Sequence, residues 1–377
     1  MQYHNRARKW LMVVCLTAAG LVGACSTTPK APAAADSGHF ADATAATSLL
    51  VRLDQLRINA HIPGLAVVVL RGSNVVLAQG LGYADVANQT PVTFNTLFNI
   101  ASVAKPISAV VAMRLVEQGL LDLDRPLSSF EGFADYCASA RQSGGLFYRD
   151  FACDVQTISL RQVLSMTVNG TPGTRFFYNP LVYSWASRPM AQVAERPFSE
   201  LVSRLVFEPA GMAQSARIHR HLALPPEAAP ALATPYAVDA RGIATVAPQP
   251  APQGDGAAGG VISSAMDLAR FDMALSQGSL LSEPSRRAMW TPARAPDGRA
   301  LPYSLGWFAR QVNGETLLWH TGLWEGAYSA LYLKAPQRNL TVILLANSDG
   351  LEWPQRLDEA AIERSVFARA VLDAYKP

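Results

Sequence analysis

Apolar positions early in the chain recur first at helical and then at strand spacing. Residues 47–59 place their leucines broadly on one side, which predicts an amphipathic helix. Residues 65–70 are a short apolar run rich in valine, typical of a buried strand, and residues 75–78 are a second strand-like run. Glycine, serine and asparagine at 72–74 are turn residues, so the two runs are predicted to form a hairpin.

The middle of the chain has mainly helical patterning. Residues 103–120 and 264–277 repeat apolar side chains at helical spacing, and a glycine marks the end of each predicted helix. Residues 222–258 are rich in alanine and proline and predict an irregular crossing segment. Shorter helical pieces are indicated around residues 159–166, 183–194 and 199–205.

Strand-like runs return near the C-terminus, and one more helical pattern follows them at residues 355–375. The runs, separated by turn residues, are residues 305–312, 327–334 and 340–346. This order of elements predicts a mixed α/β fold of the α+β type. We expect an antiparallel sheet that is flanked by helices and built from both chain ends, with a mainly helical lobe inserted at about residues 106–255.

The N-terminus has the composition of an export signal. Arg6, Arg8 and Lys9 precede an apolar stretch at residues 10–22 that is too short and too interrupted for a membrane span. These three cations account for the whole formal net charge of +3. Because the remainder is neutral and has no basic patch interleaved with aromatic residues, the composition argues against a nucleic-acid partner.

Small residues lead into a cysteine directly after this stretch. The run Leu-Val-Gly-Ala-Cys ends at Cys25 and resembles the lipobox of bacterial lipoproteins, which implies a signal peptide at 1–24 and a lipid on Cys25. Ser26 rather than aspartate follows, so the resemblance implies the periplasmic face of the outer membrane of a Gram-negative cell. The alternative is an ordinary secretory signal with a chance cysteine. Residues 25–44 predict a flexible tether ahead of a domain at 45–377.

The chain contains four cysteines. Cys15 lies in the predicted signal peptide and Cys25 is the predicted lipid site, which leaves Cys137 and Cys153. An even pair in an exported chain is a candidate disulfide, and the alternative is two unrelated buried thiols. A metal site at this pair is disfavoured because no histidine cluster accompanies it.

Ser102 and Lys105 carry the chemical hypothesis. Residues three apart face the same way on a helix, and a serine hydroxyl needs a nearby base to become a nucleophile. Lysine can be that base when burial favours its neutral form, and apolar residues follow Lys105. Pro106 is tolerated only near a helix start, so Ser102 is predicted at the N-terminal end, where free backbone N–H groups can hold an oxyanion.

The surrounding residues resemble a known family. Residues 98–106 read Phe-Asn-Ile-Ala-Ser-Val-Ala-Lys-Pro and resemble the first motif of the penicillin-recognising serine hydrolases, most closely the branch of class C β-lactamases, D-Ala-D-Ala peptidases and related esterases. Residues 117–124 also match, and residues 258–271 and 303–307 resemble family scaffold segments. The resemblance runs from about residue 47 to the C-terminus. It implies a β-lactamase/transpeptidase-like fold and an acyl-enzyme mechanism that needs no metal or organic cofactor.

By the same resemblance, Tyr178 corresponds to the family tyrosine that shares the general-base role and later protonates the leaving group. A Pro-Gly-Thr sequence leads into it, as in the family. The alternative is a buried structural aromatic. The family commonly has an asparagine two residues after this tyrosine, where the chain has Pro180, and Asn179 is one residue too early to replace it. This departure puts recognition of a β-lactam or peptide amide in doubt.

The third family element is the run Trp-His-Thr-Gly that contains His320, Thr321 and Gly322. The resemblance implies that His320 and Thr321 contact a substrate carboxylate or assist proton transfer. Gly322 would keep the strand close to the substrate, and the backbone N–H of Leu323 would pair with that of Ser102 as the oxyanion hole. The alternative is a lone structural histidine. The family has lysine or histidine here, and histidine suits peptidases and esterases better than efficient β-lactamases.

Two hypotheses of function follow. The first is an exported, lipid-anchored serine hydrolase that cleaves a small-molecule or peptidoglycan-derived ester or amide, with carboxylesterase or D-amino-acid peptidase favoured over strong β-lactamase. The second is a non-catalytic module of the same fold that binds peptidoglycan or a protein partner, supported only by Pro180. His219 and His221 alternate without acids or cysteines beside them, which is a poor metal site. No feature of the sequence indicates an oligomeric state.

Overall fold

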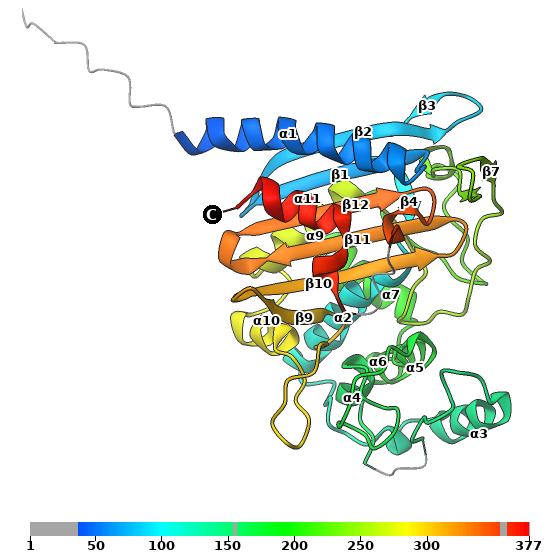
Figure 1. The fold of residues 1–377 in the computed structure, drawn as a ribbon. Coiled ribbons are helices and arrows are strands. Elements are labelled where there is room, and N and C mark those ends of the chain that lie inside the picture. The colour runs from blue at the N-terminus through cyan, green and yellow to red at the C-terminus, as the bar shows by residue number, and fades with distance from the viewer. Residues whose placement is uncertain (1–36, 154–156, 355–359, 377) are drawn as a thin grey trace, which may run out of the picture.

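The computed structural model describes residues 37–153, 157–354 and 360–376 (Figure 1). At its centre is a seven-stranded antiparallel sheet with the strand order β3-β2-β1-β12-β11-β10-β9. The strands are β1 (Gly64–Arg71), β2 (Asn74–Asp85), β3 (Thr90–Pro91), β9 (Phe308–Val312), β10 (Glu315–Trp324), β11 (Tyr328–Ala335) and β12 (Leu340–Ala346). Strand β1 pairs with β12, so the first and last strands of the chain meet in mid-sheet. This confirms the predicted sheet built from both chain ends.

Helices cover both faces of the sheet (Figure 1). Helix α1 packs against α11 and β2 on one side, whereas α9 packs against β1 and β12, and α2 against β10, on the other. The helices are α1 (Ser37–Asn59), α2 (Ala104–Glu117), α3 (Phe133–Ser143), α4 (Leu160–Leu164), α5 (Pro180–Trp185), α6 (Ser187–Ala194), α7 (Phe198–Val202), α8 (Glu208–Ala210), α9 (Ala265–Gln277), α10 (Glu283–Trp290) and α11 (Val366–Ala374).

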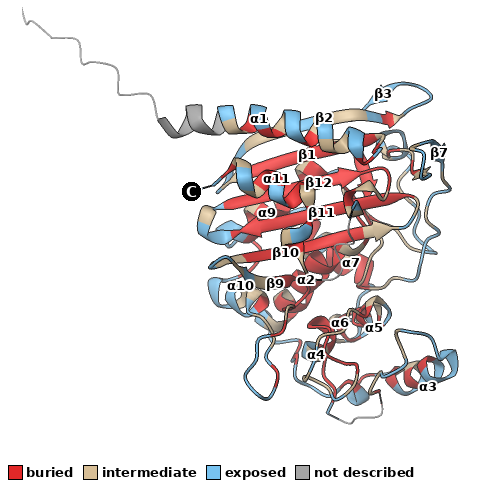
Figure 2. Cartoon of the chain, viewed as in Figure 1, coloured by how far each residue is buried: buried red, intermediate tan, exposed pale blue. Residues whose placement is uncertain are grey.

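The core runs through the middle of the sheet and the helices behind it (Figure 2). Every residue of β11 and β12 is buried, and so is nearly every residue of β1, because both faces of these strands are covered. Helix α2 is also buried along most of its length, as its apolar pattern predicts. Burial of one large apolar side chain contributes about 1.5–3 kcal/mol to the stability of the fold. These elements therefore form a rigid support for residues 101–103, which come directly before α2.

Two smaller β-structures complete the fold. Strands β4 (Leu97–Asn99), β8 (Val261–Ser264) and β5 (Ala216–Arg217) form a three-stranded sheet that leads directly into the 3₁₀ turn η1 (Ala101–Val103) and α2. The hairpin of β6 (Tyr236–Val238) and β7 (Ala244–Val246) lies inside the predicted irregular segment. Helices α3 to α6 form the inserted lobe at one side of the sheet (Figure 1).

The predicted disulfide partners are neighbours in this lobe. Cys137 on α3 and Cys153 are both buried, and each sulfur faces the other residue's carbonyl oxygen, at 2.9 Å for Cys137 Sγ and 3.8 Å for Cys153 Sγ. The structure holds them as thiols, so the disulfide is not present in it. Their adjacency satisfies one requirement for a disulfide, and the bond itself stays a prediction.

Two terminal elements differ from expectation. Helix α1 begins at Ser37, inside the predicted tether, and not near Thr47. The final helix α11 begins at Val366, because residues 362–364 form a separate 3₁₀ turn. The predicted signal peptide at 1–24 and the lipid site Cys25 lie outside the described residues. Among the helices that the structure describes, none is long and apolar enough to cross a bilayer.

Candidate active site

Ser102 and Lys105 meet where η1 runs into α2. Lys105 Nζ lies 2.7 Å from Ser102 Oγ and donates a second hydrogen bond to the Ala258 carbonyl oxygen at 3.0 Å. The lysine is fully buried, and among the described residues no carboxylate pairs with it. Burial therefore lowers the pKa of Lys105 to about 7. Near neutral pH a large fraction of this amine is uncharged and able to accept a proton.

Two tyrosines flank the amine. Lys105 Nζ lies 5.2 Å from the ring centre of Tyr178 and 5.5 Å from that of Tyr183. Tyr183 is fully buried, and its hydroxyl donates to the Lys105 carbonyl oxygen at 3.0 Å, which holds the backbone of α2. Tyr178 is only half-buried and stacks on Phe308 with ring centres 5.9 Å apart. The structure thus places the sequence-predicted tyrosine beside the serine–lysine pair.

Strand β10 comes into direct contact with the turn that carries the serine. A Cβ on Gly322 would lie 2.2 Å from the Ile100 carbonyl oxygen, so only glycine allows this approach. Leu323 follows on the same strand and is half-buried. The two backbone segments that would supply the predicted oxyanion hole, those of Ser102 and Leu323, are therefore adjacent.

His320 is enclosed in the protein. The ring is fully buried, with Nδ1 2.6 Å from the Thr321 carbonyl oxygen and Nε2 2.8 Å from the Tyr303 hydroxyl. Burial, and secondarily the charge of Lys105, lowers the pKa of His320 well below its usual range. The imidazole is therefore neutral: Nδ1–H donates to the carbonyl, and Nε2 accepts from the tyrosine. A contact with a substrate carboxylate would require one of these bonds to break, and Thr321 is also buried.

The chain uses Asn179 and Pro180 to begin a helix. Pro180 is the first residue of α5, and Asn179 Oδ1 caps the helix by accepting from the Val182 backbone N–H at 3.0 Å. The amide nitrogen of Asn179 donates to the Phe147 carbonyl oxygen at 2.7 Å and to Asn169 Oδ1 at 2.9 Å. Asn179 is fully buried and cannot take the place of the missing family asparagine.

Four groups of the site have no role predicted from the sequence, and one of them is Tyr183, which holds the Lys105 carbonyl oxygen. The family resemblance implies only a scaffold role for Tyr303, yet its hydroxyl bonds His320 Nε2. The Ala258 carbonyl oxygen binds the lysine, and Asn99 bridges the two segments beside Ser102. Tyr303, Ala258 and Asn99 each lie in a segment that resembles the family, at residues 303–307, 258–271 and 98–106, but the resemblance gives none of them a role at the site.

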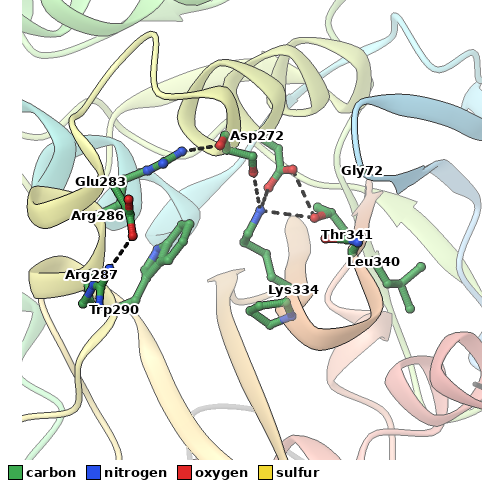
Figure 3. Close-up of a pocket in the computed structure, with 12 residues that line it drawn as sticks. Gly72, Asp272, Glu283, Arg286, Arg287, Trp290, Lys334, Leu340 and Thr341 are labelled. Carbon is green, nitrogen blue, oxygen red and sulfur yellow. Dashed lines mark hydrogen bonds and ion pairs between the residues drawn. The ribbon is translucent and has the colours of Figure 1, made fainter.

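A separate cavity of about 390 Å³ lies between α9, α10 and the β11–β12 turn (Figure 3). Its floor is a buried ion pair between Lys334 and Asp272. The lysine also donates to Ser276 Oγ at 3.2 Å and Thr341 Oγ1 at 3.3 Å. With Asp272, these partners account for the three N–H donors of the Lys334 ammonium group. This network ties α9 to the sheet. In the described part of the chain, no three histidine, cysteine, aspartate or glutamate side chains are grouped as metal ligands.

Known proteins resemble the chain in both sequence and fold. A penicillin-binding protein of Bacillus subtilis is 26% identical over 333 residues, which cover 78% of this chain and 70% of the relative. Esterase EstB of Burkholderia gladioli is 28% identical over 208 residues, or 44% of this chain and 51% of the esterase. The structure of a β-lactamase/D-alanine carboxypeptidase from Pseudomonas syringae matches with a TM-score of 0.68 at 18% identity, over 89% of this chain and 100% of that one.

The family assignment rests on the length of the match as well as on the site. The family model described as Beta-lactamase matches residues 49–366, which include the serine–lysine pair, the neighbouring tyrosine and the strand that approaches them. Fold and sequence agree across nearly the whole described domain. The chain therefore belongs to the β-lactamase family of serine hydrolases.

Proposed function

We propose that the protein is a carboxylesterase that hydrolyses uncharged carboxylic esters through an acyl-enzyme on Ser102. Neutral Lys105 accepts the hydroxyl proton while Ser102 Oγ attacks the ester carbonyl carbon. The backbone N–H groups of Ser102 and Leu323 hold the oxyanion. The proton passes by way of Tyr178 to the departing alcohol, which leaves the acyl group on the serine. Water then attacks the acyl-enzyme, releases the carboxylic acid and returns the proton to Ser102.

The observation that carries the preference for uncharged substrates is the neutral, enclosed His320. Penicillins and D-Ala-D-Ala peptides both present a carboxylate close to the bond that is cleaved. In the described structure no arginine and no second lysine hydrogen-bonds to Ser102, Lys105 or His320. A carboxylate next to this ring would lose part of its water shell, and the neutral imidazole would supply no opposite charge in return, which is unfavourable.

Two further observations support an ester rather than an amide. Pro180 stands where the family asparagine recognises an amide, and Asn179 is committed to capping α5. The sequence is also similar to Esterase EstB over part of its length. The non-catalytic alternative loses its only support, because proline is favoured at the first position of a helix and this explains the presence of Pro180.

A matched pair of esters tests the charge preference. We expect an N-acylglycyl ester of lactamide to be hydrolysed with a kcat/KM about 10- to 100-fold above that of the same ester of lactate, which carries a free carboxylate. The reason is the cost of burying an unpaired charge, about 1–3 kcal/mol or more. Release of lactamide or lactate, measured by chromatography at pH 7.5, gives both values.

Ser102→Ala is the control for this comparison, since any hydrolysis that it retains does not pass through the serine. A preference for the lactate ester, or rapid consumption of benzylpenicillin with a mass adduct on Ser102, would contradict the proposal and favour a peptidase or β-lactamase. Ester binding without turnover in both proteins would favour the binding module.

We also propose that the protein is exported and anchored to the membrane by a lipid on Cys25, as its N-terminal sequence indicates. Each buried lipid methylene contributes about 0.8 kcal/mol to membrane binding. In a Gram-negative host fed an alkynyl fatty acid, we expect the full chain to be labelled and to partition into detergent. Cys25→Ser should remove the label, whereas Cys15→Ser should retain it. Label on the Cys25→Ser protein would contradict this proposal.

A further inference from the structure

We infer that Asn99 is a positioning residue that ties together the two backbone segments of the proposed oxyanion hole. One segment is η1, which carries Ser102, and the other is the end of β10, which carries Leu323. This inference rests on the proposed function, because it assigns Asn99 a part in stabilising the same transition state.

A single oxygen atom makes the connection. Asn99 Oδ1 accepts from the Ala101 backbone N–H at 3.1 Å and from Trp324 Nε1–H at 3.0 Å. Asn99 is buried, at 4% exposure, so water competes little for these bonds. The Trp324 donor lies 225 residues further along the chain, and no regular secondary structure would bring it to this oxygen.

The bond to Ala101 acts on the nucleophile. Ala101 has a φ of +46°, a left-handed conformation that residues with a Cβ rarely adopt. An asparagine oxygen that accepts from the backbone two residues later forms an Asx turn, which stabilises such a local bend. Because Ser102 follows Ala101 directly, this conformation sets the direction of the Ser102 N–H.

The bond to Trp324 acts on the second donor. Strand β9 pairs with β10 only as far as Trp319, so the later part of β10 has a strand partner on one side, β11, and η1 on the other. The side chain of Asn99, which lies on the η1 side, accepts a hydrogen bond from Trp324, the last residue of this strand. Leu323 lies between Gly322, which touches Ile100, and Trp324, which Asn99 holds.

Together, the two hydrogen bonds therefore fix the distance between the backbone N–H groups of Ser102 and Leu323. An oxyanion hole works only when its donors are already placed for the charge that develops in the transition state. A displacement of about 1 Å at a reacting centre can lower the rate by about 100-fold. Loss of Asn99 should therefore affect the chemical step more than the binding of substrate.

Kinetics of three variants test this role with the lactamide ester. We expect Asn99→Ala to lower kcat by about 10- to 100-fold with KM changed less than about twofold. Trp324→Phe, which keeps an aromatic ring but lacks the N–H, should lower kcat by about three- to tenfold. The double variant should be no slower than Asn99→Ala alone, because both substitutions break the same link.

Asn347→Ala is the matched control. Asn347 is also a fully buried asparagine: it accepts from the Gly64 N–H at 2.7 Å and donates to the Tyr83 carbonyl oxygen at 3.1 Å. Its replacement should lower the melting temperature but leave kcat per folded molecule unchanged. If Asn99→Ala behaves like Asn347→Ala, Asn99 is merely structural and the inference is wrong.

Labelling of Ser102 by a fluorophosphonate, followed by intact mass, separates this inference from the proposed function. If the parent protein reacts with the phosphonate but hydrolyses neither ester, the esterase proposal fails, and slower labelling of Asn99→Ala and Trp324→Phe still supports the inference. Equal labelling rates in folded variants overturn it. Should Asn99→Ala not fold, Trp324→Phe gives the answer alone, and no labelling of the parent overturns both.

Discussion

Exchange of Lys105 for arginine is expected to lower kcat for ester hydrolysis by about 10⁴-fold or more, the scale seen when a nucleophile loses its base. Arginine keeps its proton at every pH at which the protein is folded, so it cannot accept the proton of Ser102. Lys105 can, because it is fully buried beside the Ala258 carbonyl oxygen and has a pKa of about 7. Steady-state kinetics at pH 8 measure the loss.

The activity of the parent protein should rise with pH if Lys105 is the base. The reactive form of Lys105 is the neutral amine, so kcat/KM should be low below pH 6, rise through a midpoint near pH 7 and level off above pH 8. His320 should add no second step in this range, because its pKa lies well below the usual one. A flat profile between pH 6 and 8 would contradict the assignment of Lys105 as the base.

The same substitution at an exposed lysine is the control. Lys376→Arg, in a surface pair with Asp373, should change kcat by less than about twofold. Because Lys105 is fully buried and arginine is the larger side chain, Lys105→Met provides a second variant of similar shape without a base. Substantial activity in both folded Lys105 variants would assign the base to another residue, with Tyr178 next in line.

Replacement of Asp272 with alanine is expected to lower the free energy of unfolding by about 3–5 kcal/mol. It removes the carboxylate from a network in which the side chain is 1% exposed. Asp272 contacts Lys334 and accepts from Thr341 Oγ1 at 3.1 Å (Figure 3). It also accepts from the Tyr332 hydroxyl at 2.6 Å. Without it, a buried ammonium group has no opposite charge. Denaturant unfolding followed by tryptophan fluorescence measures the difference.

Two comparisons define this effect. Asp272→Leu combined with Lys334→Met removes both charges and should recover most of the lost stability. Arg287→Met breaks the pair with Glu283 on the rim of the same cavity, where both side chains are largely exposed, and should change stability by less than about 1 kcal/mol. An Asp272→Ala protein as stable as the Arg287→Met protein would show that the pair adds nothing.

The sequence predicted best what depends on neighbouring residues. Ser102 and Lys105 are three residues apart at a helix start, so local geometry alone brings them together. The runs at 65–70 and 340–346 are strands because continuous apolar, β-branched segments suit a sheet that is buried on both faces. The order of these elements, with strands near both chain ends and helices between them, then indicated one sheet assembled from both ends of the chain.

Other features depended on contacts between distant residues. His320 was expected to face substrate, but Tyr303 is brought to its ring by the fold and occupies one of its nitrogens. The Ala258 oxygen belongs to the backbone, so its bond to Lys105 does not depend on the residue type at this position and cannot be read from the sequence. Asn99 resembles any polar residue at a strand end until Trp324 is placed beside it.

The helix ends follow the same distinction. The start of α1 at Ser37 lies among alanines, which favour a helix even without an apolar stripe, so no amphipathic spacing predicts it. The late start of α11 reflects a cap: Ser365 Oγ accepts from the Ala368 N–H at 3.2 Å. Neither feature affects the site.

The pairing of β1 with β12 has a consequence for how the molecule folds. Gly64 and Asn347, which are hydrogen-bonded at the end of this pair, are 283 residues apart in the chain. So long a loop closes slowly, and contacts of this separation are typical of slow folding. Until the last strand has been made, the edge of β1 is open to wrong partners. In the sequence, Ser102 lies between the strands β1 to β3 and the strands β9 to β12. The site can therefore be assembled only after the C-terminal strands have paired with the N-terminal ones.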